Sequence, residues 1–278
     1  MKTAIYRNFI DIAIITALSW GCATTKEPST LAALKTQYDA AILDSKIVEP
    51  AEIYNKLIAI SPTNKALQWQ TDAAGQPRVL VVTWTAFAGY KNQIGQETTT
   101  YQELWVTAVP ELKTFCQNIT LDKTDLTLRL NQLMGLPPDA DKTYLVEMWV
   151  APNALFRPSP DPEIEDQTAE LDFPDTKQDS LRTTHRVWFE NLKAVAYNPN
   201  GYPWTRLGYT YDWGNQYSEV GLSEFVIRSG AKITIKMFMT QWNTATNKGL
   251  RSSKIHFISK CVAIGYLIHM QIKICYST

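Results

Sequence analysis

The chain has 278 residues, and its 27 basic and 27 acidic side chains give a formal net charge of zero. This balance excludes the broad basic surface on which general nucleic-acid binding depends, so we expect no nucleic-acid partner. Hydrophobic residues make up 45% and charged residues 19% of the sequence, which is ordinary for a globular protein.

Residues 1–22 have the order of an export signal. Lys2 and Arg7 precede an apolar stretch, and small residues then lead to Cys22. The stretch is too short to span a bilayer, which takes roughly 20 residues. We predict that Cys22 carries a lipid anchor. Two alternatives stay open: plain secretion after cleavage at Ala23, and a buried N-terminal helix of a cytosolic protein, which Asp11 within the apolar stretch favours.

The remaining chain divides into three segments. Residues 23–49 are predicted to form a tether and a leading helix, and residues 50–245 a domain. Residues 246–278 form an atypical basic tail without any acidic residue. We favour a non-native extension, such as translation past a frameshift, for this tail. A basic segment resting on anionic lipid and an ordinary terminal element are the alternatives.

Hydrophobic periodicity and turn residues predict the elements of the domain. Helices are expected at 31–42, 52–60, 110–116 and 124–134, and strands at 66–70, 78–87, 98–109 and 144–150. Residues 157–180, rich in proline and acid, predict a solvated surface loop. An ordered segment at 187–197 precedes two strands, 222–228 and 232–240, which are expected to form a hairpin. Together these elements predict a single α+β domain with a mainly antiparallel sheet and a few short helices.

An unusual aromatic segment lies near the end of this domain. Its aromatic and arginine side chains are Tyr202, Trp204, Arg206, Tyr209, Tyr211 and Trp213. Aromatic faces stack on sugar rings, and arginine can stack on an aromatic face, so an exposed set of this kind is a candidate ligand-binding face. The alternative is a strand and turn whose aromatic residues fill the core.

Catalytic candidates are few. Asp212, Glu219 and Glu224 lie near the aromatic segment, and glycoside hydrolysis needs two carboxyl groups about 5–9 Å apart. His185 precedes them, without a nucleophile motif nearby. The acidic run at 161–179 lacks the spacing of a calcium loop, and the cysteines lack the spacing of a zinc site. We therefore predict no metal site and no cofactor.

Three blocks between residues 105 and 240 resemble segments of uncharacterised bacterial exported proteins. They begin at Trp105-Val106, at Phe156-Arg157-Pro158 and at Gly201-Tyr202-Pro203-Trp204. The resemblance implies a cell-envelope protein, periplasmic or on the outer face of a membrane, without implying an activity. We predict a lipoprotein that binds a glycan or an envelope protein through residues 202–213. The alternative is a periplasmic hydrolase that acts on glycans through paired carboxylates.

Overall fold

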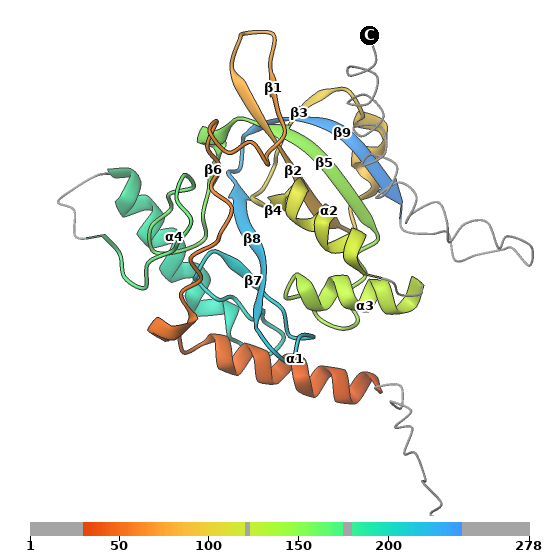
Figure 1. The fold of residues 1–278 in the computed structure, drawn as a ribbon, viewed down its shortest axis with the longest axis vertical. Coiled ribbons are helices and arrows are strands. Elements are labelled where there is room, and N and C mark those ends of the chain that lie inside the picture. Colours follow the sequence, from red (N-terminus) through yellow and green to blue (C-terminus); the bar gives the residue numbers. More distant parts are fainter. Residues whose placement is uncertain (1–29, 120–122, 175–179, 241–278) are drawn as a thin grey trace, which may run out of the picture.

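The structure, a computed structural model, describes residues 30–119, 123–174 and 180–240 (Figure 1). It confirms the predicted fold class, because one mainly antiparallel sheet of nine strands is combined with short helices in a single domain. The predicted signal segment, Cys22 and the basic tail at 246–278 lie outside the described residues.

Strand β2 (Pro77–Thr85) occupies the middle of the sheet, and its three partner strands all run antiparallel to it. The strand order is β3-β9-β5-β2-β4-β8-β6, with β1 paired to β2 and β7 paired to β8. The other strands are β1 (Trp69–Thr71), β3 (Glu97–Thr99), β4 (Leu104–Ala108), β5 (Tyr144–Val150), β6 (Leu155–Phe156), β7 (Tyr209–Tyr211), β8 (Val220–Ile227) and β9 (Lys232–Thr240). The strands predicted at 66–70 and 78–87 are confirmed as β1 and β2, which pair in antiparallel fashion.

Both faces of β2 are buried, which explains its nearly continuous apolar sequence. Val79 and Val81 enter one hydrophobic core with residues of β4, β5, β8 and β9. Leu80 and Val82 enter a second core on the other face. Helices α2 (Val109–Asn118) and α3 (Lys123–Leu133) cover that second core, where Cys116 is buried.

The predicted hairpin of β8 and β9 is wrong. Three strands separate β8 from β9 in the sheet, which in a flat sheet would put them about 19 Å apart. Residues 228–231 join them, and a fully extended chain of that length reaches at most about 18 Å. This connection also turns at Gly230, whose φ is +80°. The sheet therefore rolls up at this end, and Thr100 holds the turn through its backbone bonds to Gly230 and Ala231.

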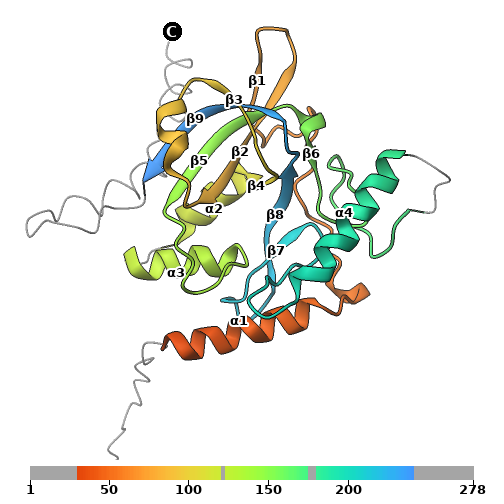
Figure 2. The same cartoon turned by 180° about the vertical axis from the view of Figure 1, so that it is seen from behind.

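Helix α1 (Leu31–Ser45) forms where the sequence predicts it. The Thr30 hydroxyl accepts a hydrogen bond from the Ala33 amide at 3.2 Å and caps the helix. Tyr38 and Ile42 pack against Trp213, so α1 lies against the domain below β7 (Figure 2).

The predicted helix at 52–60 is wrong, because only the short turn η1 (Pro50–Glu52) is helical there. The chain that follows buries Leu57 and Ile60, and their amides bond to carbonyls of the predicted solvated loop. Arg157, at the start of that loop, is fully buried and donates to the loop carbonyls of Glu163 and Asp166. Its guanidinium also lies over the Phe225 ring of β8, which holds the loop against the sheet.

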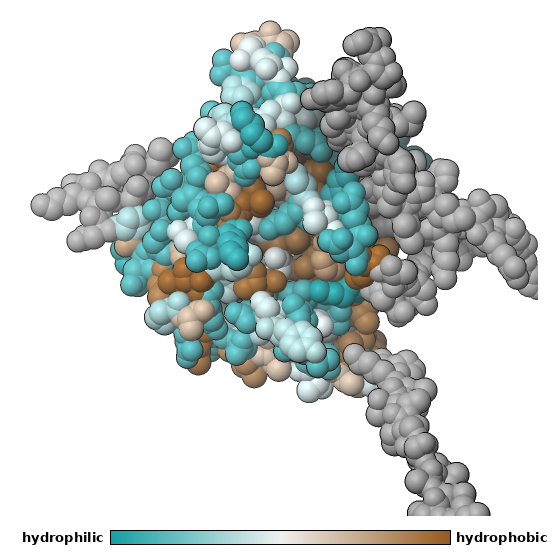
Figure 3. All heavy atoms as spheres, in the orientation of Figure 1, coloured by the Kyte–Doolittle hydropathy of each residue, from teal (hydrophilic) through white to brown (hydrophobic). Residues whose placement is uncertain are grey.

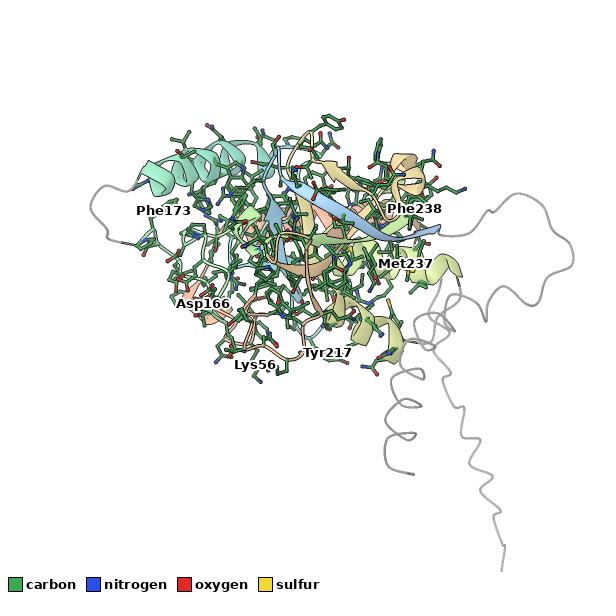
Figure 4. The ribbon with its side chains drawn as sticks, turned by 90° about the horizontal axis from the view of Figure 1, so that it is seen from above. Lys56, Asp166, Phe173, Tyr217, Met237 and Phe238 are labelled. Atoms are coloured by element: carbon green, nitrogen blue, oxygen red, sulfur yellow. The ribbon has the colours of Figure 1, made fainter. Side chains whose placement is uncertain are left out.

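Helix α4 (Ser180–Ala196) follows this loop and covers one side of the molecule. Two further turns, η2 (Ala88–Gln93) and η3 (Pro152–Ala154), complete the described elements. In the view of Figure 4, Phe173 lies near α4, whereas Met237 and Phe238 lie on β9 at the opposite end. Phe173 packs edge-on against Phe189 of α4, with ring centroids 5.1 Å apart.

Candidate functional site

A cavity of about 530 Å³ opens between the sheet and the end of α4. This volume is within the range of small-molecule sites. Its lining combines three tryptophans, Trp84 of β2, Trp105 of β4 and Trp204, with Tyr202 and Glu224. The rim is open to solvent, since Tyr202 is 51% exposed, and Val195 of α4 is 57% exposed.

A tight turn after α4 forms one wall of the cavity. Asn200 has a φ of 65°, a left-handed conformation that asparagine tolerates better than most residues. At Gly201, a side chain would place Cβ 1.9 Å from the Ala196 carbonyl oxygen, so only glycine fits. The Tyr202 amide donates to that same carbonyl at 2.8 Å. Tyr38 of α1 also donates to the Gly201 carbonyl, which fixes the turn to the core.

The polar ends of several lining aromatic residues are bound within the chain. The Trp84 indole donates to the Asn131 side chain, and the Trp204 indole donates to the Pro158 carbonyl, both at 3.2 Å. Tyr211 donates its hydroxyl hydrogen to Asp44 at 2.7 Å. These bonds hold the rings in place. Trp84 and Trp204 are 7% and 5% exposed, so each presents only a small part of its ring to the cavity.

Glu224 is a partly buried acid of β8 that lines the same cavity. It pairs with Thr107 of β4, and Trp105 lies two residues from Thr107, so Trp105 and Glu224 share one face of the sheet. Within the described chain, the Glu224 carboxyl has no hydrogen bond and no ion pair. Burial alone raises the pKa of Glu224 to about 8, so at neutral pH the carboxyl group is mostly protonated.

The other two acidic candidates form hydrogen bonds with residues outside the cavity. Asp212 is buried and accepts two hydrogen bonds from Arg129, at 2.7 and 2.5 Å. Glu219 accepts a hydrogen bond from the Tyr209 hydroxyl at 3.4 Å. Neither lines the cavity, so the structure does not bring the three predicted acids into one site.

His185 also lies outside the cavity. It is buried, stacks on Trp188 with ring centroids 5.4 Å apart, and its Nε2 lies 2.7 Å from the Ser159 carbonyl oxygen. Burial is the largest influence on its pKa, which is lowered from the usual value for histidine. These contacts give His185 a packing role between α4 and the Ser159 loop.

The structure divides the predicted aromatic face into separate environments. Tyr202, Trp204 and Tyr211 line the cavity. Tyr209 and Trp213 are 1% and 9% exposed, belong to the core and lie outside the lining. Trp204 is 5% exposed and belongs to a core cluster as well as to the lining. Small, separate hydrophobic patches among hydrophilic residues mark the face of the molecule drawn in Figure 3.

Arg206 has its own environment, with a φ of 60°. Its guanidinium lies over the Tyr197 ring and donates to the carbonyl of Lys46 at the end of α1. It lines a smaller hollow of about 240 Å³ together with Arg186 and Lys193 of α4. Arg206 is therefore placed away from the larger cavity.

Two lining residues, Trp84 and Trp105, were not among the predicted site residues. Both lie on strands far from the aromatic segment in sequence, and only the pairing of β2, β4 and β8 brings them to Glu224. A tryptophan near a strand end is the sequence signal that could have drawn attention to them.

Across the ranges that the structure describes, no cluster of histidine, cysteine and acidic residues could hold a metal ion. None of the helices in those ranges combines the length and the apolar character needed to cross a bilayer. Comparisons with protein-family models, curated proteins and solved structures gave no significant match.

Proposed function

We propose that the protein is a non-catalytic binding protein that takes a small glycan in the cavity between α4 and the sheet. One observation carries this proposal. The cavity brings together three tryptophans and a carboxyl group without a partner among the described residues. The aromatic segment contributes Tyr202, Trp204 and Tyr211 to the lining, and β2 and β4 add Trp84 and Trp105.

The chemistry of the lining fits a sugar better than a purely apolar ligand. Aromatic faces pack against the C–H face of a sugar ring, and the Glu224 carboxyl can hydrogen-bond to a polar substituent. The export signal expected at residues 1–22 supports the same ligand class, because an exported envelope protein meets surface glycans.

Binding is better supported than hydrolysis. The cavity has two carboxyl residues in its lining, Glu103 and Glu224. Glu103 lies four residues before Thr107, the partner of Glu224, so the spacing along β4 separates the backbones of the two acids by about 13 Å. Paired catalytic carboxyl groups lie about 5–9.5 Å apart. Glu103 also accepts a hydrogen bond from the Trp188 indole at 2.7 Å, so this carboxyl group already has a partner on α4.

A matched pair of tyrosines tests the proposal. Tyr202 lies at the cavity rim and is 51% exposed, whereas Tyr217 is 96% exposed and lies outside the lining. Binding of neutral trisaccharides is measured by calorimetry for wild type, Tyr202→Ala and Tyr217→Ala. We expect about tenfold weaker binding for Tyr202→Ala, equivalent to about 1.4 kcal/mol, and no change for Tyr217→Ala. Equal binding by all three proteins would contradict the proposed site.

The membrane anchor at Cys22 is a second part of the proposal. Intact mass of the membrane fraction tests it, with Cys22→Ala expressed beside the wild type in a bacterial host. We expect a diacylglyceryl-sized mass increase on a chain that begins at Cys22, and its loss in the variant. An unmodified wild-type chain in the soluble fraction would contradict the anchor while leaving the cavity proposal intact.

A further inference from the structure

Some polar groups of the cavity lining already form hydrogen bonds with other residues of the chain, and others do not. The Thr210 hydroxyl donates to the Leu133 carbonyl at 2.6 Å and accepts from the Leu222 amide at 2.8 Å. Trp84, Trp204, Tyr211 and Glu103 are likewise engaged by other residues. Glu224 is the lining carboxyl that the described chain leaves without a hydrogen bond. Glu224 is therefore a partly buried carboxyl group that is open to a hydrogen bond from or to a ligand.

The charges around Glu224 do not favour its ionised form. On α2, Glu111 is occupied by Ser223 and Thr107, and on α3 Arg129 is paired with Asp212. Lys142 and Glu103 line the cavity, yet neither pairs with Glu224. The α4 residues in the lining, Leu192, Val195 and Ala196, are uncharged. Because the carboxyl is desolvated and no cation is paired to it, it retains its proton at neutral pH.

We propose, resting on the function proposed above, that Glu224 donates a hydrogen bond to a carbonyl oxygen of an uncharged, N-acetylated sugar. A protonated carboxyl is a donor, and an amide carbonyl can only accept, so the two groups are complementary. The methyl of the same acetamido group packs on the indole of Trp105, which shares the sheet face with Glu224. A free amino sugar would instead present an ammonium donor to a carboxyl that holds a proton.

Two trisaccharides that differ only in acetylation test this ligand class. The trisaccharide of N-acetylglucosamine and that of glucosamine are titrated into the full chain by calorimetry between pH 6.5 and 9.5. We expect the acetylated probe to bind more tightly at pH 7. Its affinity should fall about tenfold between pH 7 and 9, because the protonated fraction of a group with a pKa of about 8 falls by that factor.

Two substitutions at Glu224 separate hydrogen-bond donation from charge. Glu224→Gln keeps a donor that does not titrate, so it should bind the acetylated probe within threefold of wild type at pH 7 and lose the pH dependence. Glu224→Leu removes the donor and should bind at least about tenfold more weakly throughout the range. Near-ultraviolet circular dichroism confirms that both variants are folded.

The outcomes distinguish this inference from the proposed function. Tighter binding of the glucosamine probe, lost in Glu224→Gln, would overturn the inference and keep the glycan site. Equal, pH-independent binding of both probes would also overturn the inference alone. Failure of folded wild-type protein to bind either probe at any pH would overturn both.

Discussion

Two acids of the β7–β8 region have opposite environments, although Asp212 is buried and Glu224 partly buried. Asp212, directly after β7, accepts paired hydrogen bonds from Arg129 and another from the Gly214 amide. Glu224, within β8, has no partner in the described chain and lines a cavity. Burial alone therefore does not mark an acid as functional; the absence of a partner at an open cavity is the distinguishing observation.

The aromatic residues of the same region divide in the same way. Trp213 packs against Tyr38 of α1, with ring centroids 5.7 Å apart, and its indole donates to the Leu136 carbonyl. Trp105 is half-buried and lines the cavity. We therefore expect stability effects at the Asp212 and Trp213 positions, and binding effects at Glu224 and Trp105.

The largest stability effect is expected for Asp212→Ala. The substitution leaves the partly buried Arg129 guanidinium without its partner, which costs about 3–5 kcal/mol in the free energy of unfolding. Urea denaturation of Asp212→Ala, Arg129→Ala and the double variant measures this coupling. The double variant should be less destabilised than the sum of the single variants. A loss below about 1 kcal/mol in Asp212→Ala would show that the ion pair is not structural.

Substitution of Trp213 should affect mainly stability, whereas substitution of Trp105 should affect mainly binding. Trp213→Ala removes a core side chain and should lower the free energy of unfolding by about 3 kcal/mol. Trp105→Ala removes a half-buried ring, so its loss should be about half as large, while glycan binding weakens at least about tenfold. Thermal denaturation and calorimetry measure the two effects. If Trp105→Ala unfolds the protein as Trp213→Ala does, the comparison between the two regions fails.

Glu224 should make the folded state less stable as the pH rises. Its folded-state pKa of about 8 lies above the ordinary value for glutamate, so between those values the folded state binds more protons than the unfolded state. The free energy of unfolding should therefore fall with pH in that window, by at most about 1.4 kcal/mol per pH unit. In urea denaturation at pH 5, 6.5 and 8, the free energy of unfolding of Glu224→Gln should increase relative to that of wild type as the pH rises. A difference between the two proteins that does not change with pH would argue against a raised pKa at Glu224.

The smallest effect is expected at His185. Burial is the main cause that lowers its folded-state pKa, so the folded state favours neutral histidine. The folded state therefore gains stability from this group above the unfolded-state pKa of about 6.5 and loses it as the pH falls below that value. Acidification from pH 7 to 5 should therefore lower the free energy of unfolding through this group. The difference between wild type and His185→Gln in urea denaturation should shrink over that range. A difference that grows on acidification would show that folding raises the pKa of His185 instead of lowering it.

Local patterns in the sequence predict much of the fold. Alternation and turn residues locate β1, β2, β5 and β9, and hydrophobic periodicity locates α1. The hairpin of β8 and β9 fails because Ser229-Gly230 marks a turn without stating which strands pair. Rolling of the sheet, a long-range property, decides the pairing.

The candidate site is harder to predict from sequence than the fold. The aromatic segment identifies Tyr202 and Trp204, and Glu224 is among the acids that it suggests. Sequence proximity equally suggests Asp212, whose partner Arg129 lies on a distant helix. Trp84 and Trp105 reach the cavity only through strand pairing. Spacing along the sequence therefore cannot distinguish an acid that has an ion-pair partner from one that has none.

Titration of the Glu224 carboxyl group in the ligand-free protein tests the account most directly. Its side-chain carboxyl ¹³C shift is followed by NMR from pH 4 to 10, and Glu224→Gln identifies the resonance. The account predicts a midpoint near pH 8, as expected for a desolvated acid without a partner. A midpoint near the ordinary value of about 4.3 would show a solvated carboxylate and contradict the role given to Glu224 in the cavity.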